Sequence, residues 1–146
     1  MGLMNHALFQ VATKALLFDG EKLLVLITPS GYIDFPGGRV DASEVELTWP
    51  EALRREVSEE IGPEVKADIG RTLFVSKRQY TKDGQTNRIA AIFFECKYLG
   101  GDITTSEEHD HHIWMTPSEL LATDRQFVSA DEKTQLQAYF AQRSTL

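Results

Sequence analysis

Three glutamates near the middle of the chain have the types and the spacing that binding of a divalent cation requires. Glu56, Glu59 and Glu60 fall at positions i, i+3 and i+4, so on a helix they share one face. Like charges at these spacings repel one another, and the negative end of a helix adds to that repulsion. A cation between the carboxylates explains an arrangement with this local cost, and oxygen ligands suit Mg²⁺ or Mn²⁺. The alternative is a solvated acidic helix on the surface.

A loop that contains glycine and proline is predicted before these acids, from Pro29 to about Ser43. Phe35-Pro36-Gly37-Gly38 places two consecutive glycines before the acidic segment. Glycine lets a backbone approach a ligand closely and adopt dihedral angles that other residues avoid. A glycine pair alone is weak evidence, but a loop of this kind followed by an acidic helix favours a cation or phosphate site.

The helix that must position the acids is predicted over residues 49–61. Thr48 and Glu51 have the spacing of a capping box, and Gly62-Pro63 is a stop signal. An apolar stripe adjoins the acids with a spacing of four residues: Leu53, Val57 and Ile61. We therefore expect the acids at the margin of the hydrophobic core, where a cleft can form.

Strands are predicted on both sides of this helix. Asp19-Gly20 and Asp83-Gly84 are typical hairpin turns between strand-forming segments. Capping-box spacings at Thr116/Glu119 and Ser129/Glu132 predict a short helix over 117–121 and a C-terminal helix ending near Gln142. The predicted strands are 11–18, 22–27, 71–80, 88–98 and 113–115. The order of elements indicates an α+β fold with a mixed sheet between helices.

Composition limits the classes of function. The 146 residues predict one domain over 1–146. A formal charge of −7 argues against a stable complex with nucleic acid, which needs a basic face. No apolar run is long enough to cross a membrane. The lone Cys96 lies in an apolar segment, where it is expected in the core, and a chain without a disulfide pair favours the cytoplasm.

Taken together, Gly38, Glu44 and the run 55–62 resemble the Nudix box, whose usual pattern is G-x5-E-x7-R-E-U-x-E-E-x-G-U with U apolar. The run Arg-Glu-Val-Ser-Glu-Glu-Ile-Gly fits the second half without a gap. The first half departs from the pattern, because Leu47 stands eight residues before Arg55. If Glu44 is the first acid, the loop is three residues longer than usual, and Glu46 competes for the role. Ser43 and Pro63 are smaller departures.

The resemblance implies a Nudix-type α/β/α sandwich and hydrolysis of a nucleoside diphosphate linked to another group, with Mg²⁺ or Mn²⁺. Glu56, Glu59, Glu60 and the carbonyl of Gly37 are then the expected metal ligands. Arg55 is expected to orient the carboxylates, and Glu44 to support the junction of loop and helix. Metal would neutralise diphosphate oxygens and lower the pKa of an attacking water.

The general base is open at this point. Glu56 in the box and Glu107 or Glu108 in the later loop are the candidates, although the loop acids also fit plain exposure. His109, His111 and His112 occupy the same loop. A zinc site there is less favoured than substrate contact or exposure, because the chain has no partner Cys or His cluster.

Substrate contacts are predicted on the second hairpin and near the glycine loop. Arg78 and Arg88, with Lys77 beside them, are candidates for phosphate binding, and Tyr32, Phe35 or Tyr80 for stacking on a base. Each also fits an ordinary structural role. The expected substrate is a nucleotide-like small molecule, and a nucleoside triphosphate or nucleotide sugar is favoured. The alternative function is a Nudix fold that senses a nucleotide without cleaving it. The resemblance also makes a homodimer possible.

Overall fold

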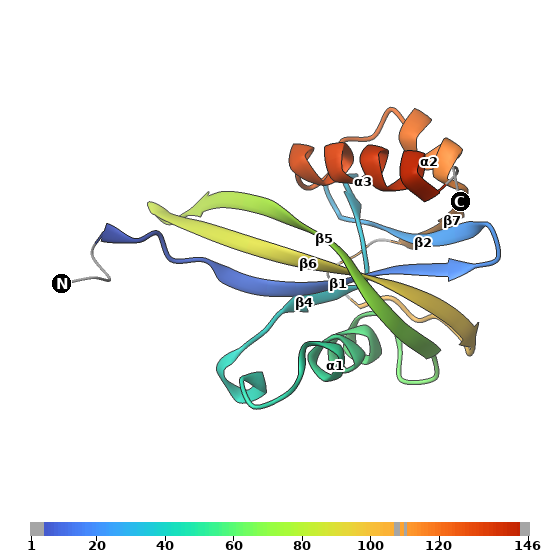
Figure 1. The fold of residues 1–146 in the computed structure, drawn as a ribbon, viewed down its shortest axis with the longest axis horizontal. Helices are drawn as coiled ribbons and strands as arrows, with labels where there is room; N and C mark the ends of the chain where they lie inside the picture. Colours follow the sequence, from blue (N-terminus) through green and yellow to red (C-terminus); the bar gives the residue numbers. More distant parts are fainter. Residues whose placement is uncertain (1–4, 107–108, 110, 144–146) are drawn as a thin grey trace.

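The computed structural model describes residues 5–106, 109 and 111–143, and it shows a mixed β-sheet with helices on both faces (Figure 1). The helices are α1 (Trp49–Ile61), α2 (Pro117–Ala122) and α3 (Ala130–Arg143), with a short 3₁₀ helix at Ala42–Glu44. The strands are β1 (Gln10–Asp19), β2 (Lys22–Ile27), β3 (Ile33–Asp34), β4 (Gly37–Arg39), β5 (Lys66–Lys82), β6 (Gln85–Gly100) and β7 (His111–Met115). The predicted α+β class and the layered arrangement are confirmed.

The central strand of the sheet is β1. The strand order is β3-β2-β1-β6-β5, while β4 also pairs with β1 and β7 with β2. β1 runs parallel to β6, and every other strand pair is antiparallel. Buried residues run without interruption from Ala12 to Phe18, as expected for a strand covered on both faces.

Two hydrophobic clusters fill the spaces between the sheet and the helices. Along β1, Leu16 and Phe18 pack in the cluster beneath α2 and α3, while Ala15 and Leu17 pack in the cluster beneath α1. This alternation follows from the two-residue period of a strand. The α1 cluster contains the predicted stripe of Leu53, Val57 and Ile61, together with Cys96, so both predictions are confirmed. α1 covers the face of the sheet opposite to α2 and α3 (Figure 1).

The ends of α1 lie where the local signals predict them. The Thr48 side chain accepts a hydrogen bond from the Glu51 N–H, and Glu51 returns the contact to the Thr48 N–H. At the other end, Gly62 has φ 109°, a conformation that side chains disfavour. The same reciprocal cap at Thr116 and Glu119 begins α2. The acidic face of α1 is therefore held at fixed positions beside the sheet.

Two sequence predictions about local structure are wrong. Ser129 and Glu132 do not form a capping box, because the Ser129 hydroxyl donates to the Lys77 carbonyl and Glu132 binds Ser76 and Arg78. The segment predicted as one loop from Pro29 to about Ser43 contains β3, β4 and the 3₁₀ helix. That 3₁₀ helix begins with a capping box between Asp41 and Glu44.

Within residues 5–106, 109 and 111–143, none of the helices has the length and apolar character needed to cross a membrane.

Candidate active site

A cleft of about 750 Å³ lies where the glycine loop, the acidic face of α1 and the C-terminal part of β5 meet. Of the predicted site residues, Gly37, Glu56, Glu60 and Arg78 line it. The sequence analysis missed several other lining residues with polar side chains: Gln10, Lys14, Asp34, Arg39, Asp41 and Gln79. Tyr80, one of the three stacking candidates, also lines the cleft.

A side chain is excluded at each of the two loop glycines, for a different steric reason. Gly37 has φ 133°, and a Cβ there would lie 2.0 Å from the backbone oxygen of Thr13, because β4 pairs closely with β1. A Cβ on Gly38 would lie 2.5 Å from Oε2 of Glu56. Gly37 is therefore required by the backbone, whereas Gly38 leaves room for a carboxylate of α1 against the loop.

Glu56 is the acid whose charge is most strongly disfavoured. Burial, and repulsion from Glu44, Glu59 and Glu60, raise the pKa of Glu56 to about 7. The i, i+3, i+4 spacing therefore concentrates negative charge on one helix face, as predicted. At neutral pH this half-buried carboxyl is divided between its charged and neutral forms.

Arg55 and Glu44 hold the junction between loop and helix. Glu44 is 1% exposed, its Oε1 accepts a hydrogen bond from the Asp41 N–H, and Nη1 of Arg55 lies 3.5 Å from its Oε2. Nε of Arg55 also lies 3.2 Å from Oε1 of Glu59. Glu46, the competing first acid, is exposed. The longer loop thus places Glu44 beside the other carboxylates and leaves Glu46 outside.

Glu60 faces a buried histidine. Nδ1 of His109 lies 2.9 Å from Oε1 of Glu60, and Nε2 lies 3.2 Å from Oδ2 of Asp34. Burial alone would lower the pKa of His109, but its contacts with these two carboxylates raise it to about 9. His109 therefore bridges α1 and β3.

Asp34 is the centre of a buried ionic network on the floor of the cleft. Its Oδ1 lies 3.3 Å from Nζ of Lys14 and 2.8 Å from Nη2 of Arg78. Burial opposes ionisation, yet the charge of Lys14 and the contacts with His109 and Arg78 hold the pKa of Asp34 well below its usual range. Arg78 also binds both oxygens of Glu132 on α3. Burial opposes protonation of Arg78, but Asp34 and Glu132 raise its pKa above the ordinary value.

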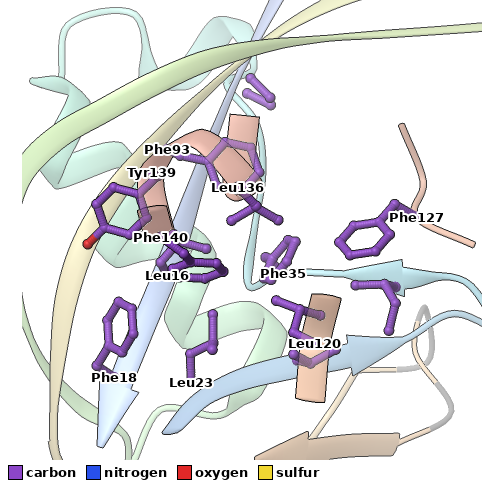
Figure 2. Packing of buried hydrophobic residues seen from close by; sticks show 14 of the residues in the cluster. Leu16, Phe18, Leu23, Phe35, Phe93, Leu120, Phe127, Leu136, Tyr139 and Phe140 are labelled. Carbon is purple, nitrogen blue, oxygen red and sulfur yellow. The ribbon is translucent and has the colours of Figure 1, made fainter. Parts of the chain in front are cut away.

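The other residues predicted to contact substrate do not line the cleft. Phe35 cannot stack on a base, because it is 0% exposed and packs edge-on against Phe93 in the core (Figure 2). Tyr32 is 41% exposed, but neither it nor Arg88 lines the cleft. Arg88 and Lys77 lie exposed on the β5–β6 hairpin. Glu107 and Glu108, the loop candidates for the general base, lie outside the described residues.

The donor atoms around Glu56 suit a hard cation, although the described side chains do not yet converge on one point. No group of three His, Cys, Asp or Glu side chains in the described part of the chain is arranged as a ready metal site. Glu59 turns to Arg55 and Glu60 to His109. Oε2 of Glu44 and Oε1 of Glu60 are buried, and each lies within ion-pair distance of a cation without a hydrogen bond of regular geometry in the described structure. Buried acceptors beside a repelled carboxylate are the surroundings that a divalent ion stabilises.

Comparison with known proteins identifies the family. The sequence model of the NUDIX domain matches residues 8–136. A U8 snoRNA-decapping enzyme from Xenopus laevis is 40% identical over 62 residues, which are 40% of this chain and 28% of that protein. The nucleoside triphosphatase NudI of Salmonella schwarzengrund is 35% identical over 94 residues, covering 60% of this chain and 64% of that protein. Both matches thus span less than two thirds of the relative's length.

Solved structures agree on the fold. A MutT protein from Methanosarcina mazei Go1 superposes with a TM-score of 0.73 at 22% identity, covering 92% of this chain and 95% of that one. An ADP-ribose pyrophosphatase from Streptococcus suis gives a TM-score of 0.67 at 20% identity, covering 94% of both chains. These structures share the fold, and the match of the family model to residues 8–136 shows that the chain belongs to the Nudix family.

Proposed function

We propose that this chain is a metal-dependent hydrolase that cleaves the diphosphate linkage of a nucleoside diphosphate derivative by water attack. The observation that carries the proposal is the acidic cluster of Glu44, Glu56, Glu59 and Glu60 against the Gly37-Gly38 loop. Only Arg55 among the described cationic side chains forms an ion pair with Glu44 and Glu59, and none forms one with Glu56. Excess negative charge at the wall of a cleft favours a cation there over an uncharged or anionic group.

Glu56, Glu59 and Glu60 are the proposed ligands of Mg²⁺ or Mn²⁺, and the carbonyl of Gly37 is a further candidate. When bound, the metal would neutralise diphosphate oxygens and lower the pKa of water. Arg55 contacts one oxygen of Glu59 and His109 contacts one oxygen of Glu60, so metal would bind the second oxygen of each carboxylate, whose position the first contact restrains. Restrained ligands lose less conformational freedom on binding.

Glu56 is the proposed general base. In the metal-free protein, burial and repulsion raise the pKa of Glu56 to about 7, which favours proton uptake by this carboxyl, and a metal on one of its oxygens would leave the other to accept the proton. In the proposed step the water oxygen bonds to phosphorus, the bridging P–O bond breaks, and Glu56 takes the proton of the water. Glu108, the loop residue predicted as an alternative general base, stays a prediction.

Tyr80 and Arg39 are the proposed stacking surface for the nucleobase of the substrate at the mouth of the cleft. The guanidinium of Arg39 lies 5.7 Å from the centre of the Tyr80 ring, and its Nη1 donates to Gln10. Aromatic rings and guanidinium groups stack on nucleobases. This pair takes the role predicted for Phe35, whose ring is in the core.

Hydrolysis of a substrate panel by the purified protein tests the proposal. The panel contains nucleoside triphosphates, ADP-ribose, a nucleotide sugar and a capped oligonucleotide, each with Mg²⁺, Mn²⁺ or EDTA. We favour a triphosphate or nucleotide sugar, and the likeness to a nucleoside triphosphatase supports the first. Turnover is expected only with metal, and Glu56→Gln should lower kcat/KM at least about 100-fold.

Glu46→Gln is the matched control for Glu56→Gln. It removes the same charge from the same part of the chain, but Glu46 is exposed and does not line the cleft. Equal losses in both variants would mean that the net charge matters and the position does not. Full metal-dependent activity in Glu56→Gln would contradict the proposed base.

Nucleotide binding without cleavage is the second candidate. It is favoured by one observation, that Glu59 and Glu60 are each paired with another side chain and do not converge with Glu56. Isothermal titration with the same panel separates the two functions. Tight binding of a nucleotide that is not turned over with either metal would favour the sensor.

Location and assembly are also proposals. We infer a cytoplasmic protein from its unpaired cysteine, and a homodimer only from the family. Cell fractionation and sedimentation equilibrium of the purified chain would check them.

A further inference from the structure

The most unusual side chain in the cleft is a lysine on the buried central strand. Lys14 is 4% exposed, and its neighbours along β1 from Ala12 to Phe18 are all buried. A buried ammonium loses its hydration, so it is retained at low cost only where oxygens replace the lost water. The apolar strand gives no packing reason for a charge at this position, since an unbranched apolar side chain would fill the same space.

The ammonium of Lys14 is surrounded by oxygen atoms. Nζ donates to the carbonyl of Phe35 at 3.1 Å and to the carbonyl of Gly37 at 3.3 Å, and it lies 3.3 Å from Oδ1 of Asp34. An ammonium has three N–H donors, so these three oxygens use them all. Two carbonyls and a carboxylate are also a donor set that a hard divalent cation accepts.

One of these oxygens is the backbone atom expected to bind metal. The carbonyl of Gly37 is the candidate backbone ligand of the proposed site, yet in this chain it already contacts a positive charge. A divalent ion on the same oxygen would be repelled by the ammonium at short range. Lys14 and a metal ion therefore compete at Gly37.

We propose that Lys14 is a resident cation that occupies the Gly37 carbonyl, so that divalent metal in this chain is held by the helix carboxylates without Gly37. This inference rests on the proposed function, because it concerns the metal site of that reaction. It follows that loss of the ammonium frees the carbonyls of Phe35 and Gly37 for a divalent ion, while Oδ1 of Asp34 still contacts Arg78. Asp34 retains Arg78 and His109 as partners, so the network on the cleft floor survives the change.

Mn²⁺ binding to the metal-free protein tests the inference without any need for turnover. Electron paramagnetic resonance of free Mn²⁺ gives the stoichiometry and Kd for wild type, Lys14→Met and Lys22→Met. Lys22→Met is the matched control, since it removes the same charge from an exposed residue that does not line the cleft. We expect Lys14→Met to bind Mn²⁺ roughly tenfold more tightly or to gain a second ion, and Lys22→Met to match wild type.

The outcomes separate this inference from the proposed function. Equal Mn²⁺ affinity in Lys14→Met and Lys22→Met, or weaker binding in Lys14→Met, overturns the resident cation and leaves the carboxylate site intact. Absence of Mn²⁺ binding in every protein, wild type included, overturns the metal site and the resident cation together.

A measurement on wild type covers the case in which Lys14→Met does not fold. The ¹³C resonances of the Gly37 carbonyl and of the glutamate carboxyls are followed during a Mg²⁺ titration. We expect the carboxyl signals to shift with saturation while the Gly37 carbonyl signal stays in place. A shift of the Gly37 carbonyl as large as that of the carboxyls would overturn the inference.

Discussion

Two groups of charged side chains, each with members that line the same cleft, differ in how their charges are balanced. On the floor, Asp34 is shared by Lys14, Arg78 and His109, and Glu132 binds Arg78 from the other side. On the wall, Arg55 is the one cation among the described side chains that pairs with Glu44 or Glu59, and none of them pairs with Glu56. Balanced buried charge holds the elements in place, whereas unbalanced charge is what a metal ion would need. The ion pairs on the floor therefore stabilise the fold, and the acids on the wall are the proposed site of metal binding and catalysis.

The largest expected effect comes from the centre of the floor. Asp34→Asn leaves the buried cations of Lys14 and Arg78 without their shared carboxylate, so we expect a loss of about 3 kcal/mol in the free energy of unfolding. Urea denaturation at pH 7 measures it. The exposed Asp124→Asn is the control. A loss below about 1 kcal/mol would mean that the network contributes no more than a surface pair.

The same substitution predicts a pH dependence. The folded-state pKa of Asp34 lies below its unfolded value of about 3.9, so its stabilisation is complete above that pH and is lost as the pH falls below it. Wild type should therefore approach Asp34→Asn in stability as the pH falls below 4. Parallel curves for the two proteins between pH 6 and pH 3 would contradict the assignment.

Substitutions at the two loop glycines test the acidic wall and the backbone that supports it independently. A Cβ on Gly38 meets the flexible carboxylate of Glu56, so Gly38→Ala should change stability by less than about 1 kcal/mol while displacing Glu56 and lowering kcat/KM roughly 100-fold. Gly37→Ala should instead lower the thermal midpoint, because its Cβ meets the Thr13 backbone and its φ is 133°. Thermal scans and steady-state kinetics distinguish the two, and equal effects in both would remove the distinction.

A smaller change in stability is expected for Glu56→Gln, and its sign is opposite to that of Asp34→Asn. In EDTA at pH 8, Glu56→Gln removes a repelled charge and should stabilise the protein by about 1 kcal/mol, discounted because Glu56 is only half-buried. The measurement is the urea midpoint with EDTA and then with Mg²⁺, which should favour wild type. Destabilisation in EDTA would mean that the wall is balanced by contacts that the structure does not show.

The smallest effect is expected at the exposed end of the wall. Glu59→Gln loses its pair with Arg55 and also some repulsion from Glu56, so in EDTA the free energy of unfolding should change by less than about 0.5 kcal/mol. A double substitution with Arg55→Gln measures how far the pair contributes. A coupling above 1 kcal/mol would place Glu59 with the buried floor instead.

The sequence predicts elements whose signals are local. The bounds of the helix over 49–61 follow from its cap, its apolar period and Gly62, and both Asp-Gly turns lie at hairpins. β5 and β6 are longer than predicted, because their pairing continues through polar residues to the turn at Asp83. The pattern of acids on one helix face also comes from spacing alone. These features require no knowledge of distant residues.

Features that depend on distant partners were not predicted. Ser129 and Glu132 have the spacing of a cap, but Arg78, 54 residues earlier, binds Glu132 more favourably than a backbone N–H would. Phe35 beside the glycine loop was expected to contact substrate, yet its ring packs against Phe93 in the core (Figure 2). Lys14 gave no signal within its apolar segment. Only the tertiary fold brings Lys14, Asp34 and Arg78 together.

The parallel pairing of β1 with β6 also bears on the order in which the chain folds. Gln10 pairs with Ile89, so the central register of the sheet joins residues 79 positions apart. The β5–β6 hairpin, by contrast, closes through a two-residue turn. Closing the longer loop costs more chain entropy before any contact compensates it, which slows folding. We therefore expect amide protons of the β5–β6 hairpin to gain protection before those of β1, and the cleft, which residues of both line, to form among the last parts of the molecule.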